Sequence, residues 1–186
     1  MAPLDHSYVF LVDAFNAEAV EKMHLLRGDA RGISSQVLVG SLSKAEDLVE
    51  NFSPQARALA RKFWPGSLSL NLQPRVDMPW DLGDSKSLGE ISIRIPSSKF
   101  VLSLLQETRP LAVSSAAPSG QPTINSVDMI LEKEIQVAII FDAGRLRMGQ
   151  LTSVVSCIQQ ETRLLREGAI SMARIKSIVP EIQVTN

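Results

Sequence analysis

The stretch LAVSSAAPSGQP, residues 111–122, combines residue types that could bind an anion. Its apolar run ends in small and hydroxylated residues, followed by Pro118, Ser119 and Gly120. Small side chains and free backbone N–H groups at a strand end can form an anion-binding concavity, and open α/β sheets usually hold ligands at such ends. Serine, proline and glycine are equally typical of an ordinary turn. The residues alone leave both interpretations open.

Two arginine-containing segments could supply cations to such a site. Arg94 interrupts the alternating isoleucines of EISIRIP, which predicts either a phosphate or carboxylate ligand or a solvated charge on an edge strand. The loop RGDARG, residues 27–32, predicts either a phosphate-binding loop or cations that stabilise the carbonyl end of a helix.

Other catalytic motifs are absent from the sequence, which has no Walker loop, no G-x-G-x-x-G and no catalytic-triad spacing. Cys157 lies in an apolar run, which favours a buried structural thiol over a nucleophile. His6 and His24 have no cysteine or acidic neighbour at ligand spacing, so we expect no protein-built metal site.

Composition places the chain among globular proteins, with 45% hydrophobic and 21% charged residues, and its 186 residues suit one domain. Its 19 basic and 20 acidic residues leave a net charge of −1, which gives no bulk-charge argument for nucleic acid. The single cysteine excludes an internal disulfide. Because no apolar run approaches the roughly 18 residues of a membrane span, and the start lacks a signal-peptide pattern, we expect a cytoplasmic protein without a membrane partner.

Alternating helix and strand signals predict an α/β domain with a mixed sheet covered by helices. In SLSLNLQP and EISIRIP the apolar residues share one face and the polar residues the other. The sequence predicts strands over residues 9–15, 36–41, 67–74, 90–96, 111–115, 137–144 and 151–158. It predicts helices capped by Asn16, Ser43 (a capping box with Glu46), Ser53, Ser97 or Ser98, Ser126 and Ser171.

Several of these segments resemble, in order and spacing, the YrdC/TsaC-like family of threonylcarbamoyl-adenylate synthases. FWPGSLSLNL is similar to that family's WPG-P-L-T segment, ISIRIP to its R-x-P strand, and LAVSSAAPSGQP to its S-S-A-N-x-S-G loop. FDAG, TSVVS and LLREGAIS resemble the D-x-G, S-T-V and R-x-G segments that follow. The WDLGD loop is similar to actinobacterial members.

The resemblance implies a twisted mixed α/β sheet with helices packed on it and a concave, positively lined cavity. It implies that L-threonine, bicarbonate and ATP are condensed into threonylcarbamoyl-AMP with release of pyrophosphate, as a step toward a modified adenosine at position 37 of tRNA. It also implies that Mg²⁺ accompanies the nucleotide. RNA or tRNA and the proteins of tRNA modification are the implied macromolecular partners. Such a reaction depends on cations around the phosphates and on alignment more than on side-chain acid–base chemistry.

Carried over by motif, the R-x-P arginine falls on Arg94, which is expected to hold substrate. Ser115 is expected near the nucleotide phosphates, and Arg166 near the nucleotide. The S-T-V hydroxyls fall on Thr152 and Ser153 in swapped order. Arg27 takes one position of the family's K-x-R phosphate-binding pair. No catalytic residue is assigned.

Three departures accompany these matches. The family's N-terminal P-T-x-T-x-Y-G segment is expected to be missing from a single domain over residues 1–186. Asp29 stands at the second cation of K-x-R, and Ala117 stands at the asparagine of S-x-N. These departures leave a second hypothesis, a catalytically degenerate relative that binds a nucleotide or RNA.

Overall fold

The computed structural model describes residues 1–85, 87, 89–131, 135–158 and 161–184. Its helices are α1 (Ala17–Arg27), α2 (Leu42–Glu46), α3 (Pro54–Phe63), α4 (Lys99–Glu107), α5 (Asp128–Leu131) and α6 (Met172–Lys176). Its strands are β1 (Ala2–Leu4), β2 (Ser7–Asp13), β3 (Gln36–Leu38), β4 (Leu68–Leu72), β5 (Ile91–Arg94), β6 (Leu111–Ser115), β7 (Ser153–Ser156), β8 (Arg163–Arg166) and β9 (Gln183–Val184).

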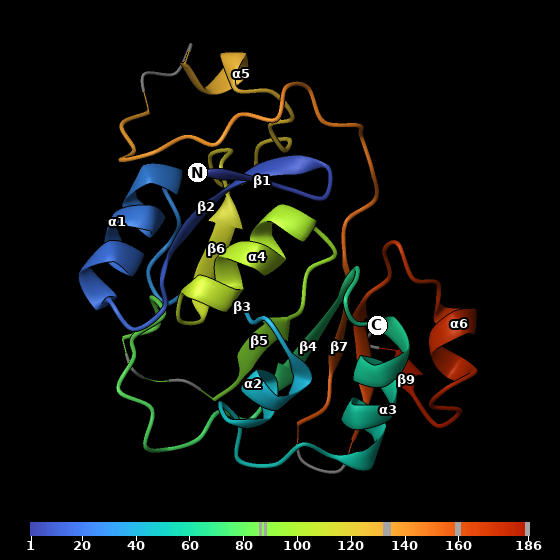
Figure 1. Ribbon diagram of the computed structural model, residues 1–186. Coiled ribbons are helices and arrows are strands. Elements are labelled where there is room, and N and C mark those ends of the chain that lie inside the picture. Colours follow the sequence, from blue (N-terminus) through green and yellow to red (C-terminus); the bar gives the residue numbers. More distant parts are fainter. Residues whose placement is uncertain (86, 88, 132–134, 159–160, 185–186) are drawn as a thin grey trace.

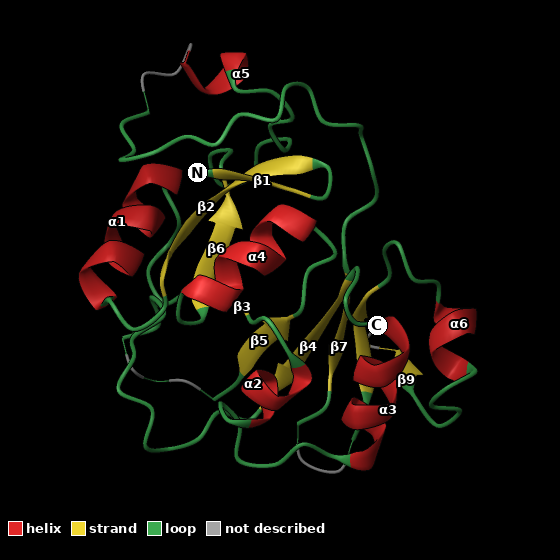
Figure 2. Ribbon diagram, viewed as in Figure 1, coloured by secondary structure: helices red, strands yellow, loops and turns green. Residues whose placement is uncertain are grey.

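The described strands form one mixed sheet in the order β1-β2-β6-β3-β5-β4-β7-β8-β9 (Figure 1). The pairs β3–β5, β4–β7 and β8–β9 are parallel, and the other neighbouring pairs are antiparallel. The helices pack around this sheet, as Figure 2 shows. The predicted α/β architecture with a mixed sheet is therefore confirmed.

Strand β5 lies inside the sheet, between β3 and β4. Its isoleucines, Ile91 and Ile93, are fully buried, as their alternation predicted. Arg94 is also buried, at 4% exposure. The interpretation of Arg94 as a solvated charge on an edge strand is wrong, because neighbouring strands cover both sides of β5.

Opposite faces of the sheet carry two apolar clusters. Val37 and Val39 belong to the larger cluster, which includes residues of α1, α2, α3 and α6, whereas Leu38 belongs to a smaller cluster under α4. Successive residues of a strand point to opposite faces, so this alternation in β3 separates the two sides. Arg94 pairs across the sheet with Leu38 and therefore shares the face that α4 partly covers.

Four of the predicted helix caps are present in the structure, and two are not. The side chains of Asn16, Ser53, Ser98 and Ser171 accept backbone hydrogen bonds at the starts of α1, α3, α4 and α6, as predicted. The cap of α2 is Ser41, not Ser43, since Ser41 Oγ accepts from the Lys44 N–H. Ser126 does not cap α5, because its hydroxyl is buried without a hydrogen-bond partner among the described residues.

The segment 137–144 is not a strand, although its apolar run predicts one. It lies beside the N-terminus, where the Met1 ammonium donates to Ile139 O at 2.7 Å and the Phe141 N–H donates to Met1 O at 3.0 Å. The Ile139 and Phe141 side chains are exposed. The run is apolar, but it is not enclosed between two layers as a sheet strand would be.

Candidate substrate pocket

A cavity of about 400 Å³ opens on the face of the sheet beside α4. Its walls come from distant parts of the chain: the β1–β2 turn, the end of α1, the segment before β3, strands β5 and β6, the loop after β6, and the residues around β7 and β8. Of the six residues selected from the sequence, Arg27, Arg94, Ser115, Thr152 and Arg166 line this cavity.

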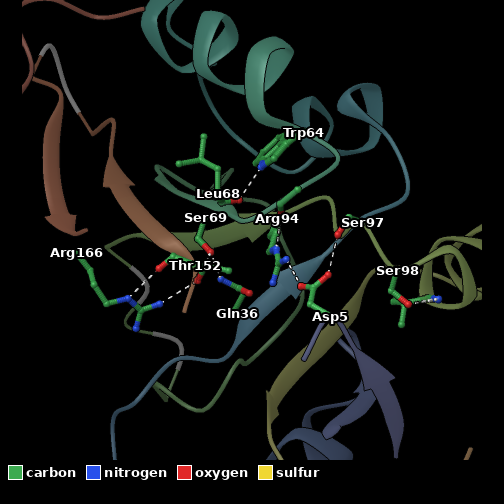
Figure 3. A network of polar contacts seen from close by, with 12 residues as sticks. Asp5, Gln36, Trp64, Leu68, Ser69, Arg94, Ser97, Ser98, Thr152 and Arg166 are labelled. Atoms are coloured by element: carbon green, nitrogen blue, oxygen red, sulfur yellow. Dashed lines mark hydrogen bonds and ion pairs between the residues drawn. The ribbon is translucent and has the colours of Figure 1, made fainter. Parts of the chain in front are cut away.

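Polar residues of neighbouring strands form a hydrogen-bonded floor (Figure 3). The Gln36 side-chain amide donates to Ser69 Oγ at 2.7 Å and to Ser92 Oγ at 3.1 Å. Ser69 Oγ in turn lies 3.4 Å from Thr152 Oγ1. The polar residues of the alternating strands therefore lie on the face of the sheet on which the pocket opens, while the leucines and isoleucines of the same strands face the larger apolar cluster.

Arg94 lies in this pocket as one half of a buried ion pair. Its Nη2 pairs with Asp5 Oδ2, and its Nε donates to Gly66 O at 2.7 Å. Asp5 Oδ1 accepts a hydrogen bond from Ser97 Oγ at 2.8 Å (Figure 3). Arg94 therefore lines the pocket, but its charge is already matched by a carboxylate of the protein.

Arg166, at the end of β8, is oriented by Thr152. Its Nε donates to Thr152 O at 3.0 Å and its Nη2 to Thr152 Oγ1 at 2.9 Å. Burial lowers the pKa of the Arg166 guanidinium, because desolvation disfavours the charged form. Arginine nevertheless stays protonated in proteins, so Arg166 presents a fixed positive charge to the cavity.

Arg27 belongs to a network with Asp29 and His24 after α1. Arg27 Nε lies 3.3 Å from Asp29 Oδ1, and His24 Nδ1 lies 2.9 Å from Asp29 Oδ2. The other ring nitrogen of His24, Nε2, lies 2.8 Å from Ser35 Oγ and 3.0 Å from Leu82 O. Asp29 therefore offsets the charge of Arg27 instead of adding a second cation.

The loop after β6 borders the pocket without forming a cradle of free N–H groups. The Ala116 N–H donates to Tyr8 O, the Ala117 N–H to Ser115 Oγ, and the Ser119 N–H to Arg27 O. Ser115 and Ser119 line the cavity, whereas Ala117 is buried. The stretch is thus a turn that brings hydroxyl groups to the pocket wall, and the backbone-cradle interpretation is wrong for these three N–H groups.

Ser153 does not reach the pocket. Its Oγ donates to Ile170 O at 2.7 Å and accepts from the N–H groups of Gly168 and Ile170, each at 3.0 Å. Thr152 and Ser153 are consecutive, so an extended backbone sends their side chains to opposite faces. Only Thr152 can line the cavity, and the prediction for Ser153 is wrong.

The β1–β2 turn, residues 5–6, and Ser7 at the start of β2 contribute pocket residues that sequence reasoning missed. A signal was present: Pro3 and Tyr8 stand five positions apart, as the proline and tyrosine do in P-T-x-T-x-Y-G. Leu4 and His6 occupy the two threonine positions of that pattern. The substituted threonines hid the similarity.

Sequence similarity places the chain in a known family. A family model covering the Sua5, YciO and YrdC proteins, described as telomere recombination, matches residues 1–168. The chain belongs to this family.

Relatives from two bacteria indicate what members of the family do. A candidate threonylcarbamoyl-AMP synthase of Mycobacterium leprae is 36% identical over 178 residues, covering 95% of this chain and 80% of the relative. The threonylcarbamoyl-AMP synthase of Bacillus subtilis is 29% identical over 191 residues, covering 98% of this chain and 53% of the relative.

Solved structures confirm the YrdC-like fold. Pyrococcus abyssi Sua5 complexed with L-threonine matches with a TM-score of 0.86 at 25% identity, covering 99% of this chain and 54% of that protein. Escherichia coli YciO matches with a TM-score of 0.77 at 22% identity, covering 90% of this chain and 82% of that protein. The chain thus spans about half the length of the archaeal structure.

The described residues contain no group of three His, Cys, Asp or Glu side chains placed to hold a metal ion. No described helix is long and apolar enough to cross a membrane.

Proposed function

We propose that this protein is an L-threonylcarbamoyladenylate synthase, which condenses L-threonine, bicarbonate and ATP into threonylcarbamoyl-AMP with release of pyrophosphate, for threonylcarbamoyl modification of tRNA. The proposal is supported by the synthase names of relatives at 29% and 36% identity, and by the L-threonine bound to the similar Sua5 structure. Partner proteins of tRNA modification and direct contact with tRNA belong to the same proposal.

One observation carries the proposal at the level of the site. Arg94, Ser115, Thr152 and Arg166 come from separate segments and meet in one cavity over the polar face of the sheet. A cavity with fixed guanidinium and hydroxyl groups can orient a carboxylate and a phosphate side by side. Orientation and electrostatic stabilisation are what this condensation needs from a protein.

In this scheme Arg166 and Thr152 hold the nucleotide phosphate, and the Ser115 hydroxyl lines the same cavity. ATP would be a substrate, bound with Mg²⁺ through its own phosphates instead of through a metal site made by the protein. Residues 3–9 would take the place of the P-T-x-T-x-Y-G segment within a single domain over residues 1–186, with Asp5, His6 and Ser7 as its pocket-lining members.

The test is pyrophosphate release by the purified protein. We expect release that requires both L-threonine and bicarbonate and that falls at least about tenfold in Arg166→Gln, since one charge-assisted contact contributes roughly 1.5–3 kcal/mol. Arg163→Gln is the matched control, because Arg163 lies on the same strand but pairs with Glu161 outside the pocket. A folded wild-type protein that releases no pyrophosphate would reject the proposal.

A specific observation favours a second candidate function, in which this protein binds a nucleotide or RNA without catalysing a reaction. Asp29 is buried against Arg27, where the family pattern has another cation. Restoration of tRNA modification in a synthase-deleted cell would reject this candidate. Its RNA version requires binding that weakens steeply with salt, since contacts to the phosphate backbone release counterions.

A further inference from the structure

The pocket carries charges of both signs. Three guanidinium groups line it, those of Arg27, Arg94 and Arg166. Two carboxylates line it as well, those of Asp5 and Asp29. Leaving the two histidines out of the count, these five side chains carry a single net positive charge.

The Asp5–Arg94 pair is largely buried in the wall of the pocket. The exposed fractions of the two side chains are 11% and 4%, respectively. Both Asp5 oxygens are occupied, one by Arg94 and the other by Ser97 Oγ. Removing either partner would leave an uncompensated buried charge, so an incoming anion cannot readily displace Asp5 from Arg94.

The Asp29 carboxylate is equally fixed. Its side chain is 4% exposed, and its two oxygens lie against Arg27 and His24. A polyphosphate approaching Arg27 would also approach this carboxylate. The repulsion acts in a partly desolvated site, where charges interact more strongly than in water.

Arg166 stands apart from these pairs. Among the described residues, no carboxylate lies within ion-pair distance of its guanidinium, which is instead oriented by Thr152. Ser115 and Thr123 also line the cavity and add neutral hydroxyl groups. This combination suits one phosphate group.

We infer that the pocket is matched to a nucleoside monophosphate unit, the adenylate part of the product, and that the β- and γ-phosphates of a nucleotide add no affinity. The choice of an adenine nucleotide as ligand rests on the proposed function. The single-phosphate preference rests on the two internal ion pairs.

The experiment is calorimetric titration of the full chain with AMP, ADP and ATP in EDTA at constant ionic strength, without threonine or bicarbonate. We expect the dissociation constants of AMP and ATP to agree within about threefold. ATP binding ten times more tightly than AMP would overturn the inference, and so would an absence of AMP binding at millimolar concentration. Pyrophosphate release is a separate readout, so the proposed function and this inference can fail independently.

A matched pair of variants tests the cause. Asp29→Asn keeps the side-chain shape and removes one negative charge, so we expect the ratio of ATP to AMP affinity to rise about tenfold. Glu18→Gln makes the same charge change on the exposed side of α1, outside this pocket, and should leave the ratio unchanged. Equal changes in both variants would overturn the local explanation.

If Asp29→Asn does not fold, the wild-type protein still supplies a test. The affinities of AMP and ATP should then depend on salt with similar slopes, because the extra phosphates find no further cation. A clearly steeper slope for ATP would overturn the inference.

Discussion

Adjacent hydroxyl residues can have entirely different tasks, as Thr152 and Ser153 show. Thr152 orients Arg166 at the pocket, whereas Ser153 Oγ makes three hydrogen bonds in the interior. Ser153→Ala should lower the free energy of unfolding by about 1–3 kcal/mol, because it leaves the N–H groups of Gly168 and Ile170 without an acceptor. Urea denaturation measures this loss. Thr152→Ala should have a much smaller effect on stability, and equal losses in both variants would contradict the assignment.

Ala117 stands where the family pattern has an asparagine, and the structure shows that its side chain packs in the interior. Its side chain is 1% exposed and belongs to the larger apolar cluster. Ala117→Asn should therefore destabilise the protein by about 1–3 kcal/mol through a buried, poorly partnered amide. Thermal and chemical denaturation test this, together with AMP titration. Unchanged stability with tighter AMP binding would show that asparagine reaches the pocket instead.

Cys157 gives a prediction that depends on pH. Desolvation raises the pKa of its buried thiol to about 12, so the folded protein holds the unreactive protonated form at pH 8. A thiol reagent should label Cys157 slowly in the native protein and rapidly in denaturant. Rapid labelling of the folded protein at pH 8 would contradict this burial.

Individual elements were predictable where the signal is local. The period-two strands β4 and β5 and the caps at Asn16, Ser53, Ser98 and Ser171 follow from neighbouring residues. The segment 137–144 was not predictable in this way, because an apolar run forms a strand only where a sheet edge is available to pair with it. The short strands β1, β8 and β9 were missed, since two to four residues give too little periodicity.

The turn between β8 and α6 positions the Arg166–Thr152 corner through a close backbone approach. A Cβ on Gly168 would lie 2.3 Å from Leu151 O and 2.8 Å from Thr152 O. Gly168→Ala should cost about 1–3 kcal/mol of stability and weaken AMP binding as the turn moves away from Thr152. Denaturation and titration measure the two effects. Gly89→Ala, where no atom lies within 4 Å of the added Cβ, is the control, and an equally stable Gly168→Ala would contradict the close approach.

At the scale of the whole molecule, sequence motifs located the pocket but did not reveal its charge balance. Arg94 and Asp5 are 89 positions apart, and they meet only because the sheet brings β5 near the β1–β2 turn. No local pattern contains such a pairing. The order of the family motifs identified five of the pocket residues, and only the folded chain shows that two of the three arginines are paired internally.

Formation of threonylcarbamoyl-AMP by the purified protein is the decisive test of the proposed synthase activity. Purified protein incubated with ATP, Mg²⁺, L-threonine and isotopically labelled bicarbonate should give an adenylate that carries both threonine and the labelled carbon in its mass spectrum. Omitting threonine or bicarbonate should abolish it, and Arg166→Gln should reduce it at least about tenfold. A folded wild-type protein that forms no labelled threonylcarbamoyl-AMP would reject the proposed synthase activity.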